Sequence, residues 1–316
     1  MPSLFARLEH GVSVIDTDFG RLRFAASFLI IENGRAAFVD TGPNSAVPGL
    51  LAALAQHGLT RDAVDWVIAT HVHLDHAGGV GALMRELPRA KLAIHPRGAR
   101  HMIDPTQLMQ GVRAVYGDAK ADHEYGELVP EPHERVVTTQ DDMVIELAGR
   151  PLRIAHTPGH AKHHHCVWDE ASRGWFTGDT FGIVYPDLAT PAGPYLVPAT
   201  APTQFDPPAL HHSVARLLAK NPDRMYLTHF GEVRDAPALS LQLLRQVDAM
   251  VGAAQPLAAA DDRHARLRAA CAEIYLAELR ALHSTLPVDE QRRILELDIE
   301  LNAQGLDAWL AWLDAS

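Results

Sequence analysis

Short apolar runs alternate with amphipathic segments along roughly the first three quarters of the chain. The runs at residues 12–15, 24–31 and 36–39 have the length and composition of β-strands. Residues 45–58 instead show helical apolar spacing that stops at a glycine. Further strands are expected at residues 66–69, 91–95, 135–137, 143–147, 152–155, 164–168, 175–177 and 225–227, and further helices at residues 79–87 and 208–220. This alternation predicts a layered α/β unit.

Two segments depart from the alternation. Residues 96–132 read as helices and loops inserted on one side of the sheet. Residues 185–208 are rich in proline and carry few regular signals. Because long loops in compact domains are often functional, we expect the second segment to be an ordered lid.

The pattern changes after Pro237, where three amphipathic helices are expected at residues 239–251, 263–284 and 288–313. We therefore predict a division into an α/β domain at residues 1–236 and a helical extension at residues 237–316. The apolar end at residues 309–313 is expected to pack onto the preceding unit, with a homodimer contact as the alternative.

Composition and net charge limit the classes of molecule that this chain is expected to bind. Apolar residues make up 47% of the 316, enough for a sizeable core. The formal net charge of −11 disfavours nucleic acid as the main partner and leaves a small-molecule substrate. No signal peptide or apolar run of membrane-spanning length is seen. The two cysteines, Cys166 and Cys271, are expected to be unpaired, and the chain reads as cytoplasmic.

Metal-ligand side chains gather directly after the apolar run at residues 67–69. His71, His73, Asp75 and His76 lie within six residues and are followed by two glycines. In an extended chain alternate side chains share a face, so the first two imidazoles should point together. The carboxylate and the last imidazole come where the strand ends. Imidazole and carboxylate at this density predict binding of divalent metal.

Three later residues follow the same local pattern. His160, Asp179 and His229 each come at the end of an apolar run, beside a glycine or a turn. Sites at strand ends are usual in layered α/β folds. These residues are therefore expected to complete the metal site.

The spacing of these motifs resembles that of a known family. The segments that carry the resemblance are Val39-Asp40-Thr41-Gly42, residues 70–79, Thr157-Pro158-Gly159-His160, Gly178-Asp179 and Thr228-His229. They are similar to the metallo-β-lactamase superfamily, and most of all to its glyoxalase II-like branch of metal-dependent hydrolases, in a subgroup with a helical tail. The resemblance implies an αββα sandwich over residues 12–232, followed by the C-terminal helical extension.

The resemblance also implies two neighbouring ions. The ligands would be His71, His73 and His160 for the first, Asp75, His76 and His229 for the second, and Asp179 as the bridge. Asp40 and His164 would support these ligands from behind, while His163 and His165 are expected at the surface. Zinc is the favoured metal, with iron or manganese as alternatives.

A binuclear centre of this kind implies hydrolysis. Hydroxide generated at the ions would attack an ester, thioester or lactone carbonyl, and Asp75 would either pass a proton to the leaving group or serve as a ligand only. The alternative is a mononuclear iron persulfide dioxygenase, whose iron would be held by His71, His160 and Asp179. The basic residues through which glyoxalase II binds glutathione have no match in residues 263–313, so the substrate stays open.

Overall fold

The first of two main sheets contains the N-terminal half of the strands. The computed structural model describes residues 5–200 and 204–314. The sheet follows sequence order, with β1 to β4 antiparallel and β4 to β7 parallel. Its strands are β1 (Phe5–Arg7), β2 (Val12–Asp16), β3 (Ala26–Glu32), β4 (Arg35–Val39), β5 (Val64–Ala69), β6 (Lys91–Ile94) and β7 (Val136–Thr138).

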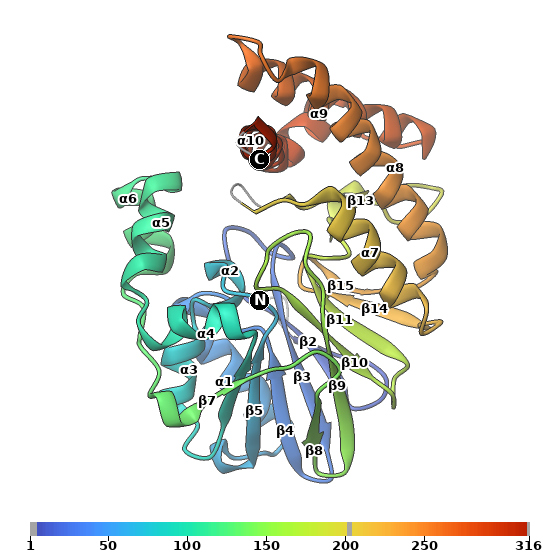
Figure 1. Ribbon diagram of the computed structural model, residues 1–316. Coiled ribbons are helices and arrows are strands. Elements are labelled where there is room, and N and C mark those ends of the chain that lie inside the picture. Colours follow the sequence, from blue (N-terminus) through green and yellow to red (C-terminus); the bar gives the residue numbers. More distant parts are fainter. Residues whose placement is uncertain (1–4, 201–203, 315–316) are drawn as a thin grey trace.

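The second sheet packs face to face with the first (Figure 1). Its order is β15-β14-β11-β10-β9-β8, and only the β11–β14 pair is parallel. The strands are β8 (Val144–Leu147), β9 (Arg150–His156), β10 (His165–Asp169), β11 (Gly174–Gly178), β14 (Arg224–Leu227) and β15 (Gly231–Val233). Phe28 of the first sheet meets Phe176 and Tyr226 of the second in a buried apolar layer.

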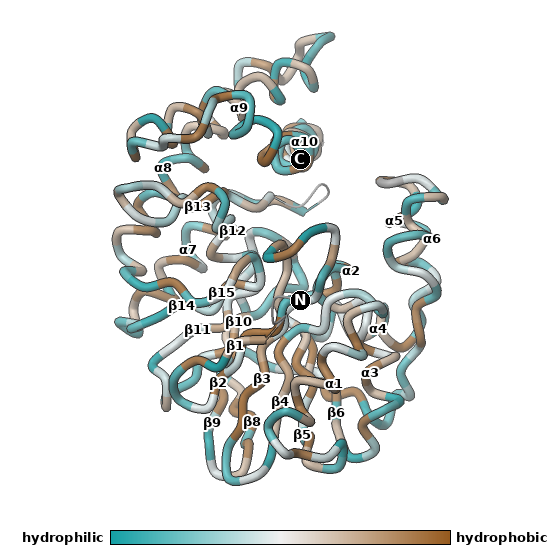
Figure 2. The backbone as a smooth tube through the Cα atoms, turned by 180° about the vertical axis from the view of Figure 1, so that it is seen from behind, coloured by the Kyte–Doolittle hydropathy of each residue, from teal (hydrophilic) through white to brown (hydrophobic). Residues whose placement is uncertain are grey.

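Helices cover the outer face of each sheet. The first sheet is covered by α1 (Val47–Gln56), α3 (Val80–Glu86) and α4 (Pro96–Ile103), whose apolar sides pack on β4, β5 and β6. The second sheet is covered by α7 (Pro207–Leu218) and α8 (Ala236–Ala254). The predicted αββα sandwich is confirmed. Figure 2 shows the apolar colours concentrated on the strands between these layers.

The helical extension predicted at residues 237–316 begins with α8 and continues with α9 (Arg263–Ala281) and α10 (Val288–Asp314), which both pack on α8. One continuous apolar core runs from Trp168 and Trp175 in the second sheet to Leu295 and Ile299 in α10. The chain after β15 is therefore held to the sandwich by buried side chains. Within the described residues, no helix is both long and apolar enough to cross a bilayer.

A helical hairpin projects from the first sheet beside the site (Figure 1). It consists of α5 (Thr106–Tyr116) and α6 (Asp118–Tyr125), within the segment predicted to be inserted. The remaining short helices are α2 (Leu74–Ala77), η1 (Asn44–Ala46), η2 (Arg61–Ala63), η3 (His133–Arg135), η4 (Pro186–Leu188) and η5 (Gln255–Leu257).

The proline-rich segment at residues 185–208, expected to be a lid, is packed against the rest of the domain over its described part. It contains a short hairpin of β12 (Ile183–Val184) and β13 (Leu196–Val197). Tyr195 is fully buried, and its hydroxyl donates a hydrogen bond of 2.9 Å to Gln246 of α8. Because its apolar side chains are packed beneath α8, the described part of this segment is anchored. Residues 201–203 of the expected lid lie outside the described residues.

Candidate metal centre

All the ligand-type residues expected from the sequence lie at one edge of the sandwich. The edge is formed by the carboxyl ends of β5, β9, β11 and β14, which are followed by the segment 71–76, His160, Asp179 and His229 respectively. β5 stops at Ala69, so the first two histidines lie in the extended link to α2 and not on the strand itself.

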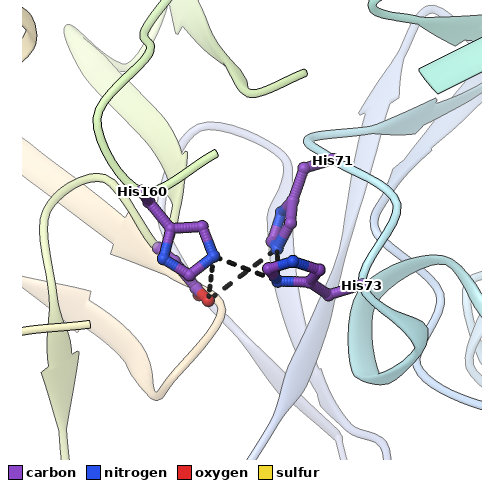
Figure 3. Close-up of side chains that lie close together, drawn as sticks. His71, His73 and His160 are labelled. Carbon is purple, nitrogen blue, oxygen red and sulfur yellow. Dashed lines mark hydrogen bonds and ion pairs between the residues drawn. The ribbon is translucent and has the colours of Figure 1, made fainter. Parts of the chain in front are cut away.

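The first group consists of His71, His73, His160 and Asp179, whose donor atoms lie within 4.8 Å of one another. His73 Nδ1 lies 2.9 Å from His71 Nε2 and 3.0 Å from His160 Nε2. Figure 3 shows the three rings turned towards one another. Ligand nitrogens around a tetrahedral zinc ion are separated by roughly 3.3 Å, the edge that follows from Zn–N bonds of about 2.05 Å.

The second group consists of Asp75, His76 and His229, and also meets the 4.8 Å limit. His229 Nε2 lies 3.2 Å from His76 Nε2 and 3.2 Å from Asp75 Oδ2. Asp75 and His76 belong to the single turn of α2, which places both side chains beside the end of β14.

Asp179 lies between the two groups, with one carboxylate oxygen towards each. Its Oδ2 is 3.4 Å from His160 Nε2, whereas its Oδ1 is 3.1 Å from His76 Nε2. Despite that proximity, Oδ1 receives no hydrogen bond of proper geometry from any described residue. Asp179 Oδ1 and His76 Nε2 are therefore close together without being hydrogen-bonded to each other. This arrangement suits a cation that both atoms could coordinate.

The electrostatics suit cations as well. Burial, reinforced by neighbouring imidazoles, lowers the pKa of His71 far below its usual value and that of His73 to about 3. Burial opposes ionisation of Asp179, but His76, His160 and His229 hold its pKa well below the usual range. Neutral imidazole and ionised carboxylate are the forms that coordinate metal. The first group is therefore already in the form that binds divalent ions. In the second group, against the effect of burial, Asp179 and Asp75 raise the pKa of His76 and His229, so these two imidazoles would give up a proton when a cation binds.

Hydrogen bonds on the far side of the rings fix which nitrogen faces the site. His76 Nδ1 lies 2.8 Å from Oδ2 of the fully buried Asp40. His160 Nδ1 donates to the Ala199 carbonyl at 3.0 Å, and His229 Nδ1 donates to the Phe24 carbonyl at 2.6 Å. Because Nδ1 carries the proton in each case, Nε2 presents a lone pair to the site.

His164 lies behind Asp179. Its Nε2 accepts a hydrogen bond of 3.2 Å from the backbone N–H of Asp179, and its Nδ1 is bonded to the hydroxyls of Thr157 and Thr180. The ring therefore positions the backbone that carries the shared carboxylate.

The expectation that His163 and His165 are surface residues is wrong. His163 is 6% exposed and His165 is fully buried. The chain turns back beneath the site after His160, so His163 faces the cavity while His165 begins β10 and bonds Thr139. Cys166 and Cys271 are buried and unpaired, as expected.

A cavity of about 300 Å³ opens above the two groups. His73, His160 and His229 form part of its floor. Its walls come from residues that the sequence analysis did not identify, because they are distant along the chain and follow no motif. These are Phe24, Tyr185, Leu108, Gly111, Val112 and Val115 of α5, and Leu297, Asp298, Leu301 and Asn302 of α10.

Gly178, the last residue of β11, occupies a position where the backbone conformation and the neighbouring side chains leave no room for a Cβ. Its φ is +47°, and a Cβ there would lie 2.5 Å from His164 Nε2 and 2.7 Å from Thr70 Oγ1. We expect Gly178→Ala to lower the free energy of unfolding by about 1–3 kcal/mol and to weaken metal binding, because His164 must move.

Gly34→Ala is the matched control, since Gly34 also has positive φ (+75°) but has nothing within 4 Å of the added Cβ. Urea unfolding and metal titration of both variants test the prediction. Equal losses in the two variants, or unchanged metal affinity in Gly178→Ala, would contradict it.

Comparison with known proteins agrees with this geometry. Residues 20–229 match the sequence profile of the metallo-beta-lactamase superfamily. The chain belongs to this superfamily. It is accordingly an enzyme of the metallohydrolase type, and the superfamily suggested by the sequence is confirmed.

Several relatives are distant in sequence. The metallo-beta-lactamase fold-containing protein ST1585 of Sulfurisphaera tokodaii is 25% identical over 59% of this chain and 67% of its own length. An atrochrysone carboxyl ACP thioesterase of Aspergillus fumigatus is 26% identical over 51% of this chain. The match spans only 41% of that thioesterase.

Solved structures show the same fold over nearly the whole chain. The archaeal ST1585 structure aligns with a TM-score of 0.66 at 20% identity, covering 94% of this chain and 98% of that one. The metallo-beta-lactamase family protein TTHA1429 from Thermus thermophilus aligns with a TM-score of 0.65 at 19% identity, covering 96% and 94%. The likeness therefore includes the C-terminal helices.

Proposed function

We propose that this protein is a binuclear metal-dependent hydrolase that cleaves an ester, thioester or lactone of a small molecule. The observation that carries the proposal is the position of Asp179, whose two oxygens face two separate groups of ligand-type side chains. A site for one ion would need only one such group.

The ligand assignments follow from the two groups. His71, His73 and His160 would hold one ion, Asp75, His76 and His229 the other, and Asp179 would bridge them. Zinc is the metal we favour, because nitrogen-rich sites with carboxylate suit it, with iron or manganese as alternatives. Two such ions, when bound, supply an activated water and polarise the carbonyl under attack.

Residues of the chain supply the remaining steps. Asp40 keeps the proton of His76 on Nδ1, away from the site. Asp75 lines the cavity, and its side chain is 23% exposed against 8% for Asp179. We therefore assign the Asp75 carboxylate to carry a proton to the leaving group, in addition to its place in the second group.

Two further considerations support an acyl substrate. The cavity, at about 300 Å³, is of the size that holds small ligands. The fungal relative named as an acyl carrier protein thioesterase cleaves a thioester, although the match covers less than half of it. The net charge of −11 argues against a nucleic-acid substrate.

The proposal is tested by supplying the purified protein with zinc and measuring hydrolysis of a panel of aryl esters, thioesters, lactones and phosphodiesters. We expect carbonyl substrates to be cleaved and phosphodiesters not. Oxygen uptake with glutathione persulfide is measured in parallel, on iron-loaded protein. Oxygen consumption without hydrolysis would overturn the proposal in favour of the dioxygenase.

A further inference from the structure

Helix α10 presents one side to the cavity, opposite α5. Leu297, Asp298, Leu301 and Asn302 all line the cavity. Asn302 is held in place, because its Oδ1 accepts a hydrogen bond from Thr200 N at 2.7 Å and its Nδ2 donates to the Pro198 carbonyl at 2.9 Å. This side of α10 is therefore a fixed wall of the site, although it is about 120 residues beyond Asp179 in sequence.

Asp298 is the one acidic side chain that α10 contributes to this wall, and its hydrogen bonding is incomplete. The residue is 5% exposed, and its Oδ1 accepts a hydrogen bond of 3.0 Å from the Tyr185 hydroxyl. Its Oδ2 is buried and has no hydrogen-bond partner among the described residues. Burial raises the pKa of this carboxyl to about 7, against the opposing effect of Tyr185.

A buried polar atom without a partner is costly. Leaving such an atom unsatisfied costs about 1–3 kcal/mol, so native structures contain few of them. Asp298 lies at the surface of a cavity that opens onto the metal-ligand residues. A bound molecule could therefore supply the hydrogen bond that the chain does not, once the carboxyl turns to bring the enclosed Oδ2 to the cavity surface.

The cavity wall near Asp298 also carries large apolar side chains, in addition to the polar Tyr185 and Asn302. Leu297, beside Asp298 on α10, is 38% exposed, and Val115 on the facing α5 is 39% exposed. Leu108 and Val112 of α5 also line the cavity and are only partly buried. Large apolar side chains left open on two facing helices suit an aliphatic or aromatic group between them.

We propose that Asp298 is a specificity-determining residue, whose Oδ2 accepts a hydrogen bond from a hydroxyl or amide N–H on an otherwise apolar acyl group held between α5 and α10. This inference rests on the proposed hydrolase function and adds the substrate class to it. A neutral donor fits best, because divalent ions, if held by the residues at the floor of the same cavity, would repel a cationic group.

The test compares Asp298→Asn with the wild type on matched substrates. Asparagine keeps an oxygen for Tyr185 but replaces Oδ2 by an NH2 group, which donates and cannot accept. The substrates are p-nitrophenyl butanoate, hexanoate, octanoate and decanoate, each with and without one hydroxyl that is moved along the acyl chain. Asp289→Asn, at an exposed position in the first turn of the same helix, is the control.

We expect Asp298→Asn to lower kcat/KM about tenfold for the best hydroxylated ester, chiefly through KM, the loss expected for one hydrogen bond. For the unsubstituted ester of equal chain length, Asp298→Asn should change kcat/KM less than about twofold. The Asp289→Asn control should leave kcat/KM unchanged for both esters. Equal losses on both esters, or none on either, would overturn the role of Asp298. Failure of the wild type to hydrolyse any ester would instead count against the proposed function.

A second variant tests the apolar channel independently of hydrogen bonding. Val112→Trp adds a large side chain to the α5 wall at a partly buried position that lines the cavity. We expect the wild type to favour the longer acyl chains, and Val112→Trp to lower kcat/KM at least about tenfold more for decanoate than for butanoate. An unchanged chain-length profile would contradict an acyl group lying between α5 and α10.

Discussion

Replacing Asp179 by alanine is expected to abolish hydrolysis and to remove metal from both sites. The reason is that its two oxygens serve two groups, so that one substitution takes a donor from each. The loss in turnover should exceed the roughly hundredfold effect typical of removing a partner behind a metal ligand. His71→Ala should also abolish metal-dependent turnover, although it removes a donor from the first group only.

The Asp179→Ala variant should still fold, because residue 179 follows the end of β11 and takes no part in strand pairing. Far-UV circular dichroism and urea unfolding of the metal-free proteins measure this. Asp223→Ala is the control, since Asp223 is an exposed carboxylate that forms, among the described residues, an ion pair with Arg173 at the surface. Activity of Asp179→Ala at the level of this control would refute the assigned centre.

The second large effect is expected at Asp40, which does not face the cavity. Its Oδ1 accepts a hydrogen bond from the backbone N–H of Thr70, and its Oδ2 lies 2.8 Å from His76 Nδ1 and from Thr228 Oγ1. In Asp40→Asn the amide oxygen must stay on the Thr70 N–H, which always donates. The NH2 group then faces His76 Nδ1.

Two donors cannot face each other, so His76 would move its proton to Nε2, the atom directed at the second group. We expect metal affinity of that group and turnover to fall about 10–100-fold. Asparagine also tolerates the positive φ of this position (+57°), so the fold should persist.

Against the effect of burial, Asp179, Asp75 and Asp40 raise the pKa of His76, so its tautomer is read in the zinc-loaded protein. Nitrogen NMR of His76 there separates this effect from simple loss of structure. Asp16→Asn is a suitable control, because Asp16 is buried and, within residues 5–200 and 204–314, its carboxylate accepts hydrogen bonds only from the backbone N–H groups of residues 18 and 23. A variant Asp40→Asn that keeps the wild-type tautomer and full affinity for two ions would contradict the explanation.

The layers of the fold and the positions of the ligand-type residues can be predicted from the sequence, because both depend on local patterns of residues. Each strand that reaches the site contains an apolar run, and a ligand-type side chain follows soon after it: Asp179 directly after β11, and His160 after the short turn that follows β9. A residue just beyond a buried strand must lie at the sheet edge, so local spacing alone brings it to the site.

The walls of the cavity depend on long-range packing and were not predictable in this way. Asp298 lies in an amphipathic helix between Glu296 and Glu300, a pattern that normally indicates a solvent-facing position. It is instead buried where α10 meets the segment that follows Asp179: Tyr185 donates a hydrogen bond to it across 113 positions of sequence, and Asn302 is hydrogen-bonded to Pro198 and Thr200. His163 was misplaced for a similar reason, since the turn after His160 folds back under the site.

The central claim is that the two groups of residues bind two metal ions together. It is tested most directly by elemental analysis of the purified chain, combined with a titration of the metal-free protein in which bound metal and hydrolysis are followed together. We predict two divalent ions per chain, with hydrolysis reaching its maximum at the second equivalent. A single iron per chain with full activity, or turnover that saturates at one equivalent, would contradict the account.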